Sequence, residues 1–437
     1  MPAPCKHSFL THNHNMHIEF IFFGIYILSC FYFIPRLRFI KNSGLSSTEI
    51  KILLALKIII AIPCAFYFES ILPYSDWASY NRQGTEHYNL LRSNPSLFFT
   101  GSGSDIDKYG LGGVFDSSNS FWGYLRFTLI YKFIAVLDLV TGGNFYLNSI
   151  VFSTIVFFGH MSFYRVYNDM FTGNKNKILF VCFLLPSVLL YTSCVHKDGL
   201  VFLCTGLASF IFYSILKSKS AITVRSVLIF LFAVFSIFFF RNYVLVAMLP
   251  AIFTALLCKM LPYSKNLIIG LSYSLYGLLF FLSSYIHSSL NLPGAVVKRK
   301  ADFESLADGS TDVPMNALYP TLKSFILNIP QAINHSLFRP YLWEFANPGI
   351  ILTALELLFY QILIVAYIFF RNKKVTIFNF YNLYGFAFFI SMMLIIGYTI
   401  PNLGAIVRYR SMVWIFVLCP VVCGIDWARL AFWQTRK

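Results

Sequence analysis

The chain has 437 residues, of which 57% are hydrophobic and only 12% are charged. Soluble domains average about a quarter charged residues, so this composition excludes an ordinary globular protein and favours an integral membrane protein. The formal net charge of +16 does not indicate nucleic-acid binding. Most Lys and Arg residues flank apolar segments, where they orient the chain in the membrane and contact anionic headgroups.

Apolar runs of about 20 residues, enough to cross a bilayer as a helix, recur along the whole chain. The first run is followed by basic residues and no small-residue cleavage site, so it predicts a transmembrane helix and not a removed signal peptide. One further stretch, residues 122–141, carries Arg126, Lys132 and Asp138 and predicts an amphipathic helix on the membrane surface. The predicted spans are residues 17–35, 51–73, 144–164, 178–195, 199–216, 223–240, 242–261, 266–288, 349–370, 378–400 and 409–425.

Lys and Arg are concentrated in short connections between these runs, and short basic connections face the cytoplasm. Placing all of them inside requires residues 122–141 to stay outside the bilayer, with the N-terminus outside and the C-terminus inside. The basic connections are residues 36–51, 165–177, 217–225, 259–265, 371–374 and 429–437. The sequence therefore predicts an all-α polytopic membrane protein with about 11 transmembrane helices.

We expect a single integral membrane domain over residues 1–437. Two outward loops interrupt it, residues 74–143, which carry the interfacial helix, and residues 289–347. The second loop begins with a basic run and an acidic stretch that are expected to be mobile. From Leu318 onward it becomes more apolar and predicts a helix at the membrane surface.

The first outward loop opens with a polar and aromatic segment directly after an apolar run. Asp76 stands beside Trp77 and close to Tyr80 and Arg82. A carboxylate at this place could take a proton from a hydroxyl nucleophile. It could equally be a helix-capping Asp within an interfacial aromatic belt, a common arrangement at helix ends.

A second cluster, His196, Lys197 and Asp198, lies between two predicted spans with almost no turn residues. Polar side chains so close to lipid are costly, which favours phosphate binding by Lys197 and His196, with Asp198 orienting one of them. The alternative is a helix–helix turn in which Asp198 caps the next helix. Arg241 separates two further apolar runs without a loop.

More arginines stand next to aromatic residues in the last third of the chain. The residues concerned are Arg339, Trp343 and Glu344 in one segment and Asn402, Arg408 and Arg410 in another. Arginine binds phosphate through two parallel hydrogen bonds and stacks on rings, although a single Arg more often only extends toward the membrane surface. In the predicted topology all these clusters face outward, so we expect them to form one site.

Several common chemistries have no signature in the sequence. P-loop, GxSxG and HExxH patterns are absent. Asp105-Ile-Asp107 is a DxD sequence, but nucleotide sugars are scarce outside the cytoplasm, so a solvated loop is the preferred interpretation. Acidic residues within the predicted spans are few, which argues against a proton-coupled transporter.

An apolar helix that leads into a long outward loop, with an Asp just past its end and surface helices before the next span, resembles the GT-C superfamily. These are polytopic glycosyltransferases that use polyprenyl-phosphate-linked sugars. The matching pieces are residues 73–76 and 122–141. The segments 186–187, 196–199, 339–344, 402–404 and 408–410 also look similar to stretches in membrane proteins of bacterial surface-polysaccharide loci. The chain departs from the GT-C pattern in having an extra helix, 17–35, and in lacking an acidic pair.

The resemblance implies a multi-pass enzyme of the bacterial cytoplasmic membrane that moves a sugar from a polyprenyl-phosphate carrier to a glycan or lipid-linked acceptor. Asp76 would be the general base. The leaving phosphate would be bound by His196, Lys197, Arg241, Arg339, Arg408 and Arg410. The sugars would be stacked on or oriented by Trp77, Tyr80, Arg82, Trp122, Asp198, Trp343, Glu344 and Asn402. The resemblance requires no cofactor and leaves a divalent metal open.

Two other functions remain open. An O-antigen-type polymerase would join lipid-pyrophosphate-linked repeat units at the outer face and would also rely on outward arginines. A flippase or transporter of lipid-linked sugars is the second alternative. A transporter should show repeat symmetry and polar residues at mid-membrane, and the sequence shows neither clearly.

Overall fold

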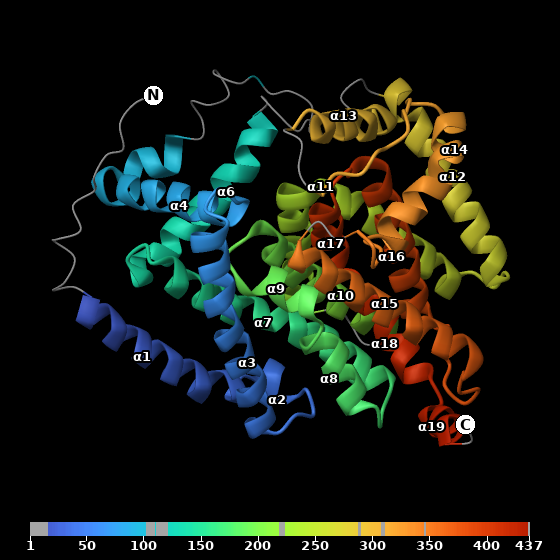
Figure 1. The fold of residues 1–437 in the computed structure, drawn as a ribbon, viewed down its shortest axis with the longest axis horizontal. Helices are drawn as coiled ribbons and strands as arrows, with labels where there is room; N and C mark the ends of the chain where they lie inside the picture. The colour runs from blue at the N-terminus through green and yellow to red at the C-terminus, as the bar shows by residue number, and fades with distance from the viewer. Residues whose placement is uncertain are drawn as a thin grey trace. The chain divides into compact units, whose positions relative to one another are not determined.

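The computed structural model describes residues 16–101, 110, 121–217, 223–286, 290–306, 311–344 and 347–435, and its regular elements are helices (Figure 1). Among these residues, seven helices are long and apolar enough to cross a membrane, or nine if each of two bent pairs is one span. The all-helical, multi-pass architecture predicted from the sequence is confirmed. The predicted count of eleven spans is not.

The chain divides into two compact units. The first comprises residues 1–98, 130–157 and 193–195, and the second comprises residues 99–129, 158–192 and 196–437. Among the described helices, α6 (Phe121–Thr141), α7 (Phe145–Met170) and α9 (Pro186–Ser193) contribute residues to both units. Each unit is described by itself.

The helices of the first unit are α1 (Met16–Phe33), α2 (Arg38–Lys41), α3 (Ser47–Phe66), α4 (Asp76–Ser93) and parts of α6 (Phe121–Thr141) and α7 (Phe145–Met170). α1, α3 and α7 follow apolar runs of the sequence, whereas α4 is a polar helix within the predicted first outward loop. α3 begins with a capping box, in which Ser46 Oγ accepts the N–H of Glu49 at 3.2 Å and the Glu49 carboxylate accepts the N–H of Ser46 at 2.8 Å. A π-helical turn, Tyr67–Ile71, extends α3, and Ser75 then caps α4.

α6 has the bounds that the sequence predicts but a different distribution of polar residues. Asp138 is fully buried, and its carboxylate accepts hydrogen bonds from Asn148 Nδ2 at 2.7 Å and from Thr85 Oγ1 at 3.2 Å. Val136 and Val140 instead point outward, 53% and 68% exposed. A surface helix would turn its polar side to water, so the predicted amphipathic arrangement is wrong here. The carboxylate is buried because the protein supplies its hydrogen-bond donors.

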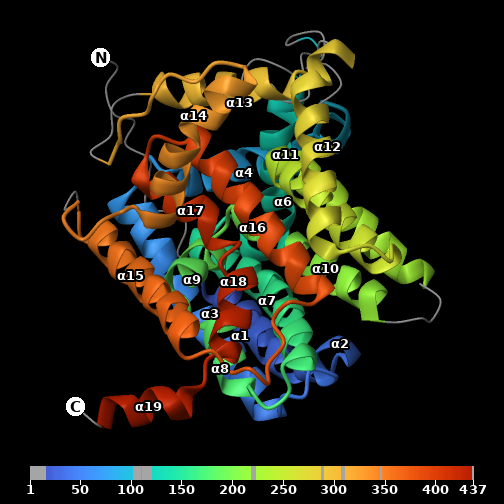
Figure 2. The same cartoon turned by 90° about the vertical axis from the view of Figure 1, so that its right-hand side faces the viewer.

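The second unit holds most of the helices. Besides the remaining parts of α6 and α7 they are α8 (Lys175–Phe183), α9 (Pro186–Ser193), α10 (Lys197–Lys217), α11 (Val224–Met260), α12 (Lys265–Ile286), α13 (Leu292–Glu304), α14 (Leu322–Ile333), α15 (Pro348–Phe369), α16 (Phe380–Thr399), α17 (Leu403–Ser411), α18 (Ile415–Gly424) and α19 (Trp427–Thr435). α8 and α9 form one of the bent pairs, at 51°, and α17 and α18 form the other, at 65°. α11 packs against α10, α12 and α16, and Figure 2 shows these helices next to one another.

α11 contains 37 residues but folds back at Arg241, whose φ of −150° and ψ of 74° are not helical. Arg241, in the middle of α11, contacts Asp198 at the start of α10. Lys259, near the end of α11, donates to the carbonyl oxygen of Leu216 near the end of α10. α11 begins at Val224, shortly after α10 ends. A straight helix of this length would extend about 55 Å, far beyond α10. The two predicted runs on either side of Arg241 are therefore antiparallel.

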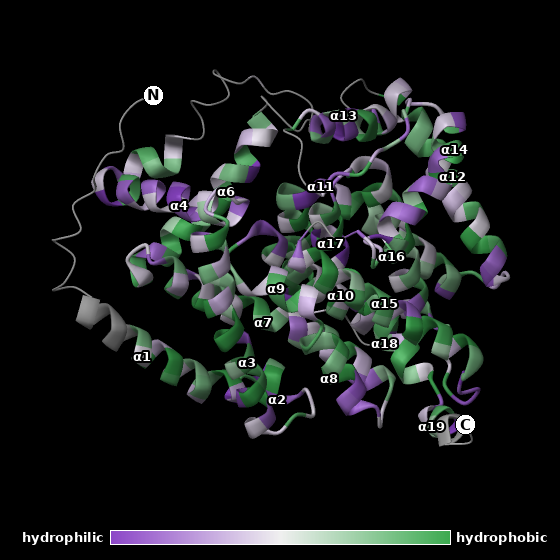
Figure 3. Ribbon diagram, in the orientation of Figure 1, coloured by the Kyte–Doolittle hydropathy of each residue, from purple (hydrophilic) through white to green (hydrophobic). Residues whose placement is uncertain are grey.

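The segment predicted as the second outward loop contains two helices. α13 includes the basic run of residues 298–300, so the first half of this segment is not irregular where the structure describes it. Figure 3 shows hydrophilic residues along α13. The helix predicted from Leu318 onward is confirmed as α14, and a π-helical turn, Asn334–Phe338, follows it. The basic run in the first half of the predicted loop and the apolar run in its second half therefore both lie on helices.

Candidate functional site

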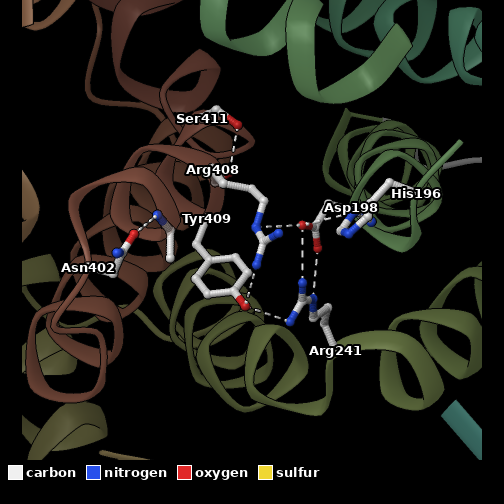
Figure 4. A network of polar contacts seen from close by, with 8 residues as sticks. His196, Asp198, Arg241, Asn402, Arg408, Tyr409 and Ser411 are labelled. Atoms are coloured by element: carbon white, nitrogen blue, oxygen red, sulfur yellow. Dashed lines mark hydrogen bonds and ion pairs between the residues drawn. The ribbon is translucent and has the colours of Figure 1, made fainter. Parts of the chain in front are cut away.

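Asp198 and Arg241 form the centre of a buried polar network in the second unit (Figure 4). Arg241 Nε lies 2.7 Å from Asp198 Oδ1, and an NH2 nitrogen lies 3.1 Å from Oδ2, so two parallel charge-assisted hydrogen bonds join them. The side chains are only 4% and 2% exposed. Each charge depends on the other for its burial, because removing one would leave the other desolvated and uncompensated.

Arg408 and Tyr409 of α17 complete the network. Arg408 Nε lies 3.5 Å from Asp198 Oδ2. The phenol oxygen of Tyr409 accepts an N–H from Arg241 at 3.0 Å and another from Arg408 at 3.2 Å. Two guanidinium groups therefore contact both the phenol oxygen of Tyr409 and the carboxylate of Asp198 (Figure 4).

His196 is also buried and contacts Asp198 in two ways. Its Nδ1 lies 3.1 Å from the backbone nitrogen of Asp198 and 3.2 Å from the carboxylate Oδ2. The two contacts need opposite proton positions, because Nδ1 accepts in the first and donates in the second. Without a proton on Nδ1 the imidazole accepts from the start of α10, and with one it donates to the carboxylate, so either state gives His196 a positioning role.

Three helix features bring the network together. Asp198 lies in the first turn of α10, where the unpaired N–H groups favour a negative charge. Arg241 stands at the break of α11, so its side chain can reach α10 and α17 together. α17 begins at Asn402, whose side chain accepts the N–H of Ala405 at 3.1 Å. Arg408 and Tyr409 lie about two turns later on this short helix, so Arg408 is helical although the sequence predicted it between two spans.

A cavity of about 500 Å³ adjoins the network. Its wall is mostly aromatic and aliphatic, and residues of α6, α10, α11, α12, α13, α14, α16 and α17 contribute to it. Four cationic side chains also line it, namely Arg126, Lys197, Arg241 and Arg299. Among the described residues in its wall, none is Asp, Glu or His. This combination suits a ligand with a long apolar part and an anionic group.

The cations of the wall lie against aromatic rings. Lys197 Nζ lies 4.4 Å from the ring centre of Phe127, and the Arg299 guanidinium lies 4.7 Å from that of Phe303. Such contacts stabilise a cation in a partly dry place. Sequence reasoning gave Arg126 and Arg299 no site role, although Arg126 does stand out as a charge within an apolar helix.

Arg339 and Glu344, both predicted site residues, pair with each other. Arg339 Nε donates to Glu344 Oε1 at 2.7 Å, and the other carboxylate oxygen accepts the N–H of Tyr341 at 2.7 Å. His335 Nε2 lies 3.4 Å from the same guanidinium. Burial, with the Arg339 charge added, lowers the pKa of His335 to about 4. The Arg339 guanidinium therefore has a structural role beside Glu344.

Arg410 and Asn402 likewise make contacts within the fold. Arg410 is 3% exposed and donates to the carbonyl oxygens of Ser336, at 2.9 Å, and of Arg339. The Asn402 side chain donates to Asp312 Oδ1 at 2.7 Å. These bonds attach α17 to the turn after α14 and to the segment before it, so neither residue joins the cavity cations.

Asp76, Trp77, Tyr80 and Arg82 belong to the first unit and all lie on α4. Asp76 is exposed in the first turn of α4, and Ser75, not Asp76, caps the helix, so the capping role predicted for Asp76 is wrong. Trp77 is 6% exposed and Tyr80 is 3% exposed, so both rings are core residues here and a sugar could not stack on them without a rearrangement. Arg82 donates to the carbonyl oxygen of Pro73 at 2.9 Å.

Two other predicted sugar contacts have aromatic neighbours. Trp343 is 70% exposed and stacks on Tyr341, with ring centres 4.7 Å apart. The ring centre of Trp122 lies 6.2 Å from that of Phe239. Of these, Trp343 keeps an open ring face to which a sugar could bind.

Asp105 and Asp107 lie outside the described residues. Within the described part of the chain, no group of three or more His, Cys, Asp or Glu residues could hold a metal ion. No protein-family model, curated protein or solved structure matches the chain. Its chemistry is therefore argued from the network and the cavity.

Proposed function

We propose that the protein is an integral membrane glycosyltransferase. It moves a sugar from a polyprenyl-phosphate-type lipid carrier to a glycan or lipid-linked acceptor at the outer face of the bacterial cytoplasmic membrane. The observation that carries the proposal is the cavity of about 500 Å³, whose wall is apolar except for tyrosines, a few small polar groups and four cations.

The two parts of the wall match the two parts of such a donor. A polyprenyl chain is a long hydrocarbon, and the aromatic and aliphatic wall of α12, α14 and α16 offers it a dry surface. The phosphate is an anion, and a wall with cations and without carboxylates attracts it. Lys197, Arg126 and Arg299 line the cavity, and we assign them to the phosphate.

The same cations would assist bond cleavage. As the bond between the anomeric carbon and the phosphate oxygen breaks, negative charge grows on the leaving lipid phosphate. Fixed positive groups in a water-poor cavity stabilise that charge more in the transition state than in the ground state. Because Lys197 and Arg299 lie against rings, little reorganisation is needed when the charge appears.

A polymerase that joins lipid-pyrophosphate-linked units is the second candidate. The number of cations in the wall favours it, because a diphosphate carries more negative charge than a monophosphate. Both functions use the same cavity and differ in the lipid-linked product that accumulates without the enzyme.

Binding of the lipid phosphate tests the proposal with purified protein. Arg299→Gln should weaken binding of a polyprenyl phosphate in detergent about tenfold or more, since a charge-assisted contact is lost. Lys298→Gln is the matched control, because Lys298 is the exposed neighbour on the same helix. Equal affinity in both variants, or no binding by the native protein, would contradict the proposal.

The lipid-linked material in a deletion strain separates the candidate functions. Accumulated truncated units indicate a transferase, and complete single units indicate a polymerase. Complete units held at the inner leaflet would instead indicate a flippase and exclude both enzymes.

A further inference from the structure

The residues that the structure describes in the cavity wall include no carboxylate or imidazole that could act as a base. Among the described residues in its wall, the groups that could take up a proton are Lys197 and five tyrosines. Glycosyl transfer to a hydroxyl needs such a group, because the acceptor must lose its proton as it attacks. The tyrosines are Tyr243, Tyr273, Tyr276, Tyr398 and Tyr409.

Three of these phenols direct their protons into the protein. Tyr276 donates to the carbonyl oxygen of Val246 at 3.0 Å, and Tyr398 donates to that of Phe325 at 3.0 Å. Tyr273 pairs with the hydroxyl of Ser391 at 3.4 Å. A phenol that donates to a backbone carbonyl would lose this bond on ionising, so these positions disfavour the phenolate.

Tyr409 has the opposite surroundings. Its oxygen accepts hydrogen bonds from Arg241 and Arg408, at 3.0 and 3.2 Å. Both donors are guanidinium groups, and hydrogen bonds from cations favour the charged form of an acceptor. Ionisation of the phenol would therefore strengthen both bonds inside a buried cluster.

Charged and titratable groups face Tyr409 from four helices. Asp198 comes from α10, Arg241 and Tyr243 come from α11, Arg299 comes from α13 and Arg408 comes from α17 itself. Three of these five groups are guanidinium groups and one is a carboxylate. The balance of charge at the phenol oxygen therefore favours the phenolate.

We propose that Tyr409, as its phenolate, is the general base of the transfer; this inference rests on the proposed function. The phenolate oxygen takes the proton of the acceptor hydroxyl, and the acceptor oxygen forms a bond to the anomeric carbon. The bond from that carbon to the lipid phosphate breaks, and its electron pair leaves with the phosphate. The phenol then returns its proton to solvent. Arg241 and Arg408 remain hydrogen-bonded to the oxygen throughout, and they are positioning residues.

Removal of the hydroxyl is the first test. Tyr409→Phe should lower kcat for sugar transfer about 10²–10⁴-fold, the usual contribution of a general base, while binding of polyprenyl phosphate persists. Tyr285→Phe is the matched control, because Tyr285 is 86% exposed. Transfer at the native rate in Tyr409→Phe would overturn the proposal. The proposal would also be overturned if Asp76→Asn or Tyr243→Phe abolished sugar transfer while Tyr409→Phe retained it.

Fluorotyrosine at position 409 is the second test, and it keeps the shape of the side chain. Fluorine makes the phenol more acidic, so the limb of the pH–rate profile that rises with pH should move to lower pH. The base role would be wrong if the pH–rate profile did not move. It would also be wrong if the limb that moved were one on which activity falls as the pH rises. If the native protein binds no lipid phosphate and transfers no sugar, the proposed function fails. If it does both and the fluorotyrosine leaves the profile unchanged, only the role of Tyr409 fails.

Discussion

The carboxylate of Asp198 lies 2.7 Å from Nε of Arg241, although 43 residues separate them in the sequence. The contact joins the first turn of α10 to the break of α11. An arginine at the point where a helix folds back would be costly in an apolar surrounding without a partner charge. The ion pair therefore explains why the break occurs at Arg241 and why α11 returns along α10.

Asp198→Asn should destabilise the protein by about 3–5 kcal/mol. The substitution keeps the size of the side chain but leaves Arg241 and Arg408 buried without their negative partner. The measurement is the free energy of unfolding in detergent.

The control for this change is Asp169→Asn. Asp169 pairs with Lys217, but the two side chains are 44% and 58% exposed. Solvent screens such a pair, so the loss should stay within about 1 kcal/mol. Equal losses in the two variants would show that burial does not govern the Asp198 pair.

The sequence predicts the helices well because span length and hydrophobicity are local properties. Residues 46–49 form the capping box expected of a Ser-x-x-Glu sequence, and the two runs around Arg241 are separate helices. The partners of polar side chains are not local. Arg339 and Arg410 are residues of the type that binds phosphate, yet Arg339 pairs with Glu344 and Arg410 donates to backbone carbonyl groups.

The opposite error is a cavity residue to which the sequence analysis assigned no role in the site. Arg126 suggests a surface helix and Arg299 suggests a solvated loop, but both line the cavity. Arg299 reaches the wall on α13, which packs against α16, and Arg126 reaches it on α6. Asp76 and the Asp198 network belong to different units, so the single site expected from the sequence stays a prediction.

Gly206→Ala should destabilise the second unit by about 1–3 kcal/mol through overpacking. A methyl group at Gly206 would lie 2.8 Å from the carbonyl oxygen of Gly159 and 3.2 Å from its Cα, so α7 and α10 would have to separate. Small residues permit this kind of close approach between membrane helices. Unfolding in detergent measures the loss.

Gly270→Ala provides the comparison, because it adds the same methyl group to α12 where nothing lies within 4 Å. Alanine is the better helix former, so this variant should be equally stable or up to about 1 kcal/mol more stable. If Gly206→Ala behaved like Gly270→Ala, the contact of α7 with α10 would not be tightly packed.

Acid should destabilise the protein through His335. Burial and the Arg339 charge lower the pKa of this imidazole from 6.5 to about 4 in the folded protein, while the unfolded chain keeps the ordinary value. Between these two pH values the unfolded state binds more protons, so stability rises with pH. The contribution is fully present above pH 6.5 and is lost as the pH falls toward 4. His335→Gln removes this titration, so the melting temperature of the variant should fall less than that of the native protein over this range. Parallel curves for the two proteins would assign the acid sensitivity to other groups.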